Sequence, residues 1–422
     1  MSERRHQVLL GARWLAALAL LVAALSTAWV RMCSGSPGVD YYQFWIVGRA
    51  RAVLDLRDPY SDAARARMAE LGRQLAREAV HGTRRLQFCA YWRDTVETFG
   101  TPLLYAGVSA ASTGDYDTDL RRFQTVSIAA FVCALAALCV LLGGGADVGL
   151  AVAALMCALS DPLASDVRTA NVGELQLGGL ALVLALSRRA EAIRVFAAGA
   201  ALAALVALKP TLALVPLLLA VALLAERKLR LLAALVAGAL AGALAAVAVG
   251  AHFLAARAWL DWLTALGGLE RVSDISVARG NYSLAQWVSE MGGPRLGPFL
   301  TGGLAAASAV SLWLGRFASS FERTFLAVAL GAAIAVLGPQ LAWLHYDVLL
   351  VPLLLFLLRP AAGAWRRAGA LACAVALLGW PLRALAGLAL DAPVYVFAGW
   401  SVVLLALVRT PRSSPRQSAS VP

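Results

Sequence analysis

Charged side chains are scarce in this sequence, and their scarcity decides the class of protein. Only 15% of the 422 residues are Asp, Glu, Lys or Arg, whereas soluble domains carry about 25%. Hydrophobic residues make up 60% of the chain, and the mean hydropathy is +0.73. A soluble fold of this size would leave large apolar patches in water. The composition therefore excludes a soluble enzyme and predicts an integral membrane protein.

Patterns that bind metals, cleave leaders or read nucleic acid are also missing. The six cysteines include no CxxC pair, so we predict no metal and no cofactor. The net charge of +12 comes without a basic stripe interleaved with aromatics, which excludes nucleic acid as a partner. No small-residue cleavage site follows the N-terminal apolar run, so we expect an uncleaved first span. Cys33 and Cys89 flank the first polar stretch, and the sequence leaves open whether they form a disulfide.

Long apolar runs dominate what is present. The first run reaches about Val30, and the later ones lie at about 123–142, 148–165, 173–187, 195–208, 210–225, 231–250, 298–315, 324–340, 347–358, 368–388 and 393–408. Since a spanning helix needs about 20 mostly apolar residues, we predict an all-α, polytopic membrane protein with about 12 (11–13) transmembrane helices. Residues 1–422 form a single membrane domain in this interpretation.

Three segments do not fit a simple span. Residues 33–100 form a polar first loop, expected to be extracytoplasmic, and Ala63–Leu71 within it has the pattern of an amphipathic surface helix. Residues 101–113 are apolar but short, and whether they span or re-enter stays open. We expect 409–422 to be a basic, disordered cytoplasmic tail.

Basic residues indicate the orientation. Arg188-Arg189, the cluster 227–230 and Arg366-Arg367 fall in alternate turns between apolar runs. Such turns face the cytoplasm, so both termini are expected there, in a bacterial-type inner membrane. The unusual polar residues then gather on the other side, which predicts an extracytoplasmic active site.

A few polar residues stand out against this background. Asp40 follows the first span, where it is either a base, a solvated loop carboxylate or a helix cap. Lys209 precedes Pro210 between two runs, as a phosphate-binding cation or a snorkelling lysine. His345 is either a ligand-binding histidine or a polar cap, and Arg279 is a weaker candidate for a donor-binding cation.

Four further residues are candidates for contacting an acceptor or for structuring the loops. Asp58-Pro59-Tyr60 has the pattern of a turn. Tyr41 lies among interfacial aromatics beside Asp40, and Glu174 is expected on the outer side, where it either orients an acceptor or is solvated. Asn281-Tyr282-Ser283 also matches a glycosylation sequon, a frequent chance match.

The order of these blocks resembles glycosyltransferase family 87, from about Ser26 to Leu358. The blocks are Gly38–Trp45, Asp58-Pro59-Tyr60, Phe99–Tyr105, Asn171–Gln176, Ala207–Thr211, Gly280–Leu284 and Trp343–Asp347. Three positions depart from the family pattern: Thr101-Pro102 stands for Pro-Pro, Asn171–Gln176 matches Gly-Gln-x-Asn imperfectly, and Tyr346 replaces a common second histidine.

The resemblance implies a GT-C enzyme that takes a mannose-like hexose or pentose from a polyprenyl-phosphate donor, with inversion, and gives it to a lipid or polysaccharide acceptor. It implies that Asp40 is the general base and that His345 lies near the active site. Since the departing phosphate needs positive charge, we predict that Lys209 and Arg279 bind the donor, together with His345 and Asn281. Two alternatives remain: a transporter or flippase of lipid-linked sugars, and a non-catalytic component of envelope assembly.

Overall fold

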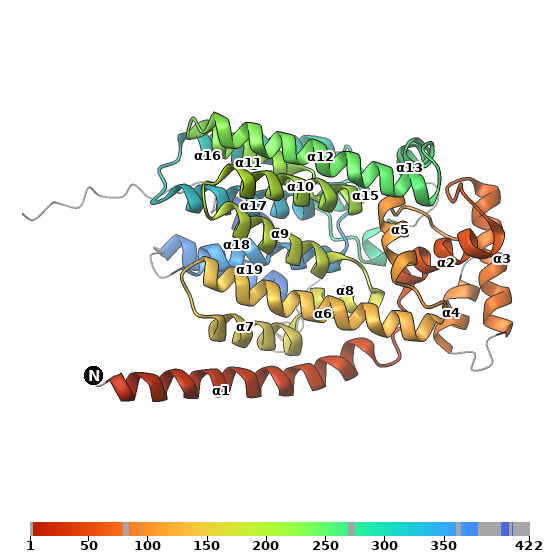
Figure 1. The fold of residues 1–422 in the computed structure, drawn as a ribbon, viewed down its shortest axis with the longest axis horizontal. Helices are drawn as coiled ribbons and strands as arrows, with labels where there is room; N and C mark the ends of the chain where they lie inside the picture. The colour runs from red at the N-terminus through yellow and green to blue at the C-terminus, as the bar shows by residue number, and fades with distance from the viewer. Residues whose placement is uncertain are drawn as a thin grey trace, which may run out of the picture.

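The fold is helical throughout the part of the chain that can be described. The computed structural model describes residues 3–78, 84–92, 94–268, 275–359, 364–378, 398–404 and 407. Within these ranges every regular element is a helix, and one isolated β-bridge joins Asn281 to Trp343 (Figure 1). The prediction of an all-α protein is therefore confirmed.

Most helices lie side by side in one bundle, with the long α1 along one edge and α12 near the opposite edge (Figure 1). The bundle helices are α1 (Glu3–Ala28), α6 (Tyr116–Leu141), α7 (Ala146–Leu159), α8 (Asp161–Thr169), α9 (Gly173–Ser187), α10 (Ala192–Leu208), α11 (Leu214–Ala225), α12 (Leu229–Phe253), α16 (Gly297–Leu314), α17 (Ser320–Leu337), α18 (Val351–Leu357) and α19 (Ala364–Leu378). Helix α17 lies at the centre, and every residue from Thr324 to Leu337 is buried.

Five helices in the described ranges are long and apolar enough to cross a membrane: α1 with the following π-helical turn η1 (Trp29–Cys33), α6, α12, α16 and α17. The pair α7 and α8 counts as a sixth if its 74° bend lies within one span. Four other predicted runs, at 173–187, 195–208, 210–225 and 347–358, form apolar helices of 10 to 17 residues, such as α9 and α10. The chain is thus a multi-pass membrane protein, while the number of about 12 spans is not confirmed.

Local sequence explains where several helices begin. Helix α6 follows Asp115, whose carboxylate accepts from the Thr118 amide at 2.8 Å. Helix α8 follows Ser160 in the same way and has Pro162 in its first turn, where a missing N–H costs nothing. This start signal interrupts the run predicted at 148–165 and produces the bend between α7 and α8.

The first loop forms a separate cap at one end of the bundle. It contains α2 (Val39–Leu54), α3 (Asp62–Glu78) and α4 (Arg84–Trp92), joined by α5 (Pro102–Ala111) and α13 (Ala258–Gly267) (Figure 1). The predicted amphipathic segment is part of α3, and its apolar side, with Met68 and Leu71, is buried in a second hydrophobic core. Ten residues of α helix rise about 15 Å, half of the hydrocarbon thickness, so α5 is too short to span.

Some sequence predictions concern other parts of the chain. The basic tail 409–422 and most of the runs predicted at 368–388 and 393–408 lie outside the described residues. Cys33 and Cys89 are both buried, and the Cys89 thiol donates to the Pro37 carbonyl at 3.4 Å rather than forming a disulfide with Cys33.

Small residues let α10 and α12 approach unusually closely. A Cβ atom added at Gly238 would lie 1.9 Å from the Phe196 carbonyl oxygen, and one at Gly199 would lie 2.2 Å from that of Leu235. Gly238 and Gly242 are four residues apart on one face of α12, the spacing that allows backbones to touch in membranes. This contact fixes α10, which ends next to Lys209.

We predict that Gly238→Ala destabilises the protein, because the added methyl group forces the two helices apart, at a cost of about 1–3 kcal/mol. Gly303→Ala is the matched control, since a Cβ there has no neighbour within 4 Å. Thermal unfolding in detergent should show a lower midpoint for the first variant and an unchanged or higher one for the second. Equal midpoints for the two variants would contradict the close contact.

Candidate active site

A cavity of about 1070 Å³ lies where the cap meets the bundle. Its wall is made by the start of α2, the segment 94–101, the α8–α9 junction, the end of α10 and the segments 275–282 and 339–346. Asp40, Lys209, Arg279 and His345 all line it, although up to 305 positions separate them in the chain. The structure therefore brings together four of the residues that the sequence singled out.

Asp40 is held at the start of α2 by an ordered turn. Gly38 precedes the helix with a φ of 66°, the left-handed region that glycine favours, and a side chain there would meet Leu120. The Tyr116 hydroxyl lies 2.6 Å from the Pro37 carbonyl oxygen and 3.0 Å from that of Gly38. Since these carbonyls immediately precede α2, the tyrosine fixes the direction in which the helix begins.

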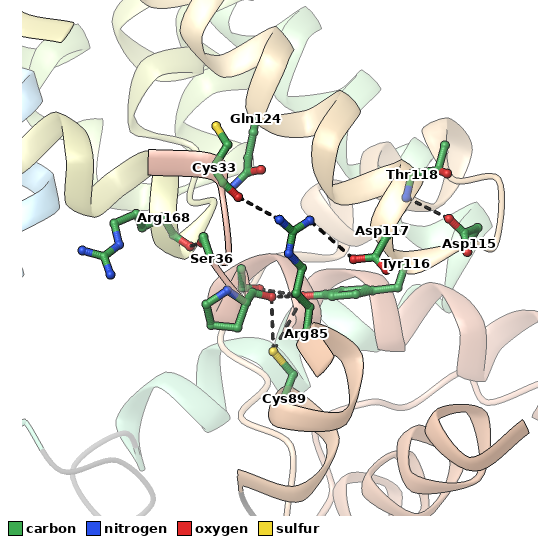
Figure 2. A network of polar contacts seen from close by, with 12 residues as sticks. Cys33, Ser36, Arg85, Cys89, Asp115, Tyr116, Asp117, Thr118, Gln124 and Arg168 are labelled. Carbon is green, nitrogen blue, oxygen red and sulfur yellow. Dashed lines mark hydrogen bonds and ion pairs between the residues drawn. The ribbon is translucent and has the colours of Figure 1, made fainter. Parts of the chain in front are cut away.

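Figure 2 shows the polar network behind this turn. Arg85 on α4 donates to the Cys33 carbonyl at 3.0 Å and forms an ion pair with Asp117 on α6 at 3.5 Å. The Cys89 thiol meets the same Pro37 carbonyl that Tyr116 contacts (Figure 2). The end of the first span, the cap and α6 are thus tied together just before Asp40.

Asn171, between α8 and α9, connects the candidate residues to one another. Its Nδ2 lies 2.7 Å from Asp40 Oδ2 and 3.0 Å from His345 Nε2. Its Oδ1 accepts from Lys209 Nζ at 2.9 Å and from the Val172 amide at 2.7 Å. We call Asp40, Asn171, Lys209 and His345 the Asn171 cluster.

A left-handed turn places Asn171 at this position. Ala170 ends α8 with a φ of 56°, which is uncommon for a residue with a Cβ atom. The backbone N–H of Asn171 donates to the Asp166 carbonyl at 3.1 Å, so the chain reverses tightly before α9 begins. Asn171 does not stand out as a site residue in the sequence, because a lone asparagine before an apolar run is typical of a helix cap.

Lys209 extends from the break between α10 and the short helix η2 (Pro210–Leu212). Its neighbour Leu208 accepts a hydrogen bond through its carbonyl from Thr101 at 3.1 Å. The Lys209 ammonium lies 4.1 Å from the centre of the Tyr346 ring, a cation–π contact. Tyr346 therefore helps to hold the cation.

The environment of Asp40 changes its acidity. The carboxyl lies deep in the protein but keeps accessible surface, because it lines the cavity. Burial raises the pKa of Asp40 above the ordinary 3.8, and the Lys209 charge together with the Asn171 hydrogen bond opposes part of this rise. A carboxylate with a raised pKa is a stronger base than an exposed one.

Asn281 does not line the cavity, and its side chain is used in joining two loops. Its amide group donates to the carbonyls of Ile275 at 2.8 Å and Gln340 at 3.0 Å, and its oxygen accepts from Ala342 at 2.9 Å. These bonds hold the segment that carries Arg279 against the segment that precedes His345.

Asp58, Tyr60 and Tyr41 also lie outside the cavity wall. Asp58 accepts from the Tyr60 amide at 2.9 Å, as the turn pattern predicts, and the Tyr60 hydroxyl donates to the Gly100 carbonyl at 2.9 Å. Tyr41 packs between Tyr116 and Phe123. All three serve the structure of the cap.

Glu174 is fully buried and faces a second buried carboxyl, that of Asp166. Neither residue lines the cavity, although both flank the turn that carries Asn171. Two carboxyl groups in contact without solvent cannot both be charged, so one of them holds a proton. Among the described residues no group of three or more His, Cys, Asp or Glu side chains is placed to hold a metal ion.

Comparison with known proteins now adds to this geometry. No curated protein and no solved structure matches the chain. The model of glycosyltransferase family 87 matches residues 99–344, more than half of the sequence. The match includes Lys209, Arg279 and Asn281, ends one residue before His345 and begins after Asp40. The chain belongs to glycosyltransferase family 87.

Proposed function

We propose that this membrane glycosyltransferase uses a polyprenyl-phosphate sugar as donor and that Asp40 is its general base. The observation that carries the proposal is the Asn171 cluster, in which a carboxylate, an ammonium and an imidazole meet at one cavity. The sugar is a mannose-like hexose or a pentose, and the acceptor is a lipid or a polysaccharide.

The reaction needs one proton acceptor and positive charge. Asp40 removes the proton of the acceptor hydroxyl while that oxygen attacks the anomeric carbon, and the bond from this carbon to the phosphate oxygen breaks. Attack opposite the leaving group inverts the anomeric centre. The polyprenyl phosphate leaves as a stable anion, so no second acid is required, unlike in glycoside hydrolysis.

The rest of the cavity suits such a donor. Lys209 and Arg279 supply positive charge beside Asp40, where the low dielectric strengthens the attraction for phosphate. Leu208, Leu266, Ile275 and Leu341 form an apolar part of the wall, which suits a polyprenyl chain entering from the lipid. No metal is required in this mechanism, since cationic side chains neutralise a single phosphate diester.

The same proposal includes the orientation. The positive-inside pattern places both termini in the cytoplasm and the cavity on the extracytoplasmic side of a bacterial-type inner membrane. A transporter would need a polar route through both leaflets, and a non-catalytic protein would have Asp40 paired with an arginine and no space beside it. Asp40 instead faces a cavity large enough for a sugar and contacts an amide.

Asp40→Asn should lower sugar transfer by about 10²–10⁴-fold and leave folding and donor binding intact, since asparagine keeps the shape but takes no proton at neutral pH. The measurement is transfer from a radiolabelled polyprenyl-phosphate sugar in membranes. Asp62→Asn on α3 is the matched control, because that side chain is 99% exposed. Near-normal turnover by Asp40→Asn would remove Asp40 as the base.

The rate of the wild-type enzyme should fall as the pH decreases, with a midpoint above pH 3.8, because burial raises the pKa of Asp40 and only the ionised carboxylate acts as a base. The measurement is the pH dependence of the transfer rate, in which this fall is the acid limb.

Lys209→Met should move this acid limb to still higher pH, because the lost charge had lowered the pKa of Asp40. It should also raise the donor KM, since the phosphate is charged before the reaction. An acid limb that does not move in Lys209→Met would show that the Lys209 charge does not act on the pKa of Asp40.

Glu174→Gln should keep transfer within a few-fold of the wild-type rate and should not lower thermal stability. The side chain does not line the cavity, and an amide would give the buried Asp166 carboxyl a hydrogen-bond donor in place of a competing acid. Transfer assays and thermal unfolding of the same preparation test both statements. A large loss of acceptor affinity would show that Glu174 contacts the acceptor.

A further inference from the structure

The Asn171 side chain uses its full hydrogen-bonding capacity, and this fixes its orientation. Lys209 Nζ and the Val172 backbone N–H can only donate, so the atom that faces them must be the amide oxygen. The NH₂ group therefore faces Asp40 Oδ2 at 2.7 Å and His345 Nε2 at 3.0 Å. Asn171 is only 5% exposed, and these four protein groups already use all of its hydrogen-bonding positions.

This orientation determines the protonation of the histidine. An amide NH₂ group has two hydrogens and no lone pair to offer, so both Asp40 and His345 must accept from it. His345 Nε2 therefore carries no proton, and the neutral ring carries its proton on Nδ1. A doubly protonated ring would set N–H against N–H at this contact and would add a second cation beside Lys209.

We infer that Asn171 is a positioning residue that holds His345 as the neutral Nδ1–H tautomer and so makes the ring a hydrogen-bond donor to the sugar phosphate. This inference rests on the proposed function, because the phosphate is the ligand it assigns to the ring. His345 lines the cavity, and its Nδ1 makes no hydrogen bond within the described part of the chain, so that N–H is open to a ligand oxygen.

The assignment divides the chemistry among the members of the Asn171 cluster. Asp40 takes the acceptor proton, and the amide contact requires that it be an acceptor before the reaction begins. Lys209 supplies positive charge. His345 donates a directed hydrogen bond to the phosphate but stays neutral, and it passes no proton to the leaving phosphate. One side chain thus sets the states of both the base and the donor-binding histidine.

The direct test is nitrogen NMR of protein labelled at its four histidines, in nanodiscs at neutral pH. We expect one ring, assigned by its loss in His345→Gln, to show a protonated Nδ1 and an unprotonated Nε2. In Asn171→Asp the new carboxylate offers only acceptors, so the ring should gain a proton on Nε2. A purely structural asparagine would leave the protonation of the ring unchanged.

Kinetics supply the second measurement. Asn171→Ala should lower kcat by about 10²-fold, because the base and the histidine lose their common support, with a smaller change in the donor KM. Gln124→Leu is the matched control: this buried amide on α6 donates to the Val167 carbonyl at 3.0 Å and does not line the cavity. It should lower stability but keep kcat.

The outcomes separate this inference from the function on which it rests. A ring with Nε2 protonated in the wild type, or one unchanged in Asn171→Asp, overturns the assignment even if the enzyme transfers sugar. If the ring has the expected tautomer but the protein does not use a polyprenyl-phosphate sugar, the proposed donor is wrong and the tautomer assignment stands. Equal kcat values for Asn171→Ala and the wild type overturn the positioning role.

Discussion

The candidate site depends on one buried amide that joins groups of opposite charge. Asp40 and Lys209 do not meet directly; each is bonded to a different end of Asn171. A direct ion pair would neutralise both residues and leave neither for a substrate. The amide donates to one oxygen of the carboxylate and accepts one hydrogen of the ammonium, while both side chains still line the cavity. In a low-dielectric setting this separation keeps both charges usable.

Three supports converge on that amide, and each comes from a different part of the chain. The cap fixes the start of α2 through Tyr116, Cys89 and the Arg85 network in Figure 2. The α8–α9 turn carries Asn171 itself, and the loops joined by Asn281 carry the histidine and an arginine. Because Asp40 comes from the cap, whereas Asn171, Lys209 and His345 come from the bundle and its loops, the site is assembled only when cap and bundle are docked together.

Much of this arrangement was predictable from the sequence, and the reasons are physical. Helices follow from apolar runs, and polar residues in such runs are costly enough that their use is a fair expectation. That reasoning selects Asp40, Lys209 and His345. It fails for Asn171 and misplaces Asn281, because an amide has the same local appearance whether it caps a helix, ties two loops or links catalytic groups. Only the tertiary partners distinguish these cases.

The predicted number of about 12 spans is not confirmed, for a related reason. An apolar run indicates burial, yet helices such as α9 and α11 are buried mainly by other helices and not by lipid alone. Their lengths of 15 and 12 residues are set by packing within the bundle and not by the thickness of the membrane. Hydropathy measures how favourably a segment leaves water, and it does not distinguish burial in lipid from burial against other helices.

The glycine contact between α10 and α12 has a consequence for how variation in this protein would be observed. Lys209 follows the last residue of α10, so the depth of its charge is set by how α10 rests on its neighbour. A bulkier residue on that contact would displace the ammonium while leaving every cavity residue unchanged. Inactive alleles recovered by genetic selection would then map to glycines buried between two helices, outside the cavity wall, and their protein would be both less stable and less active.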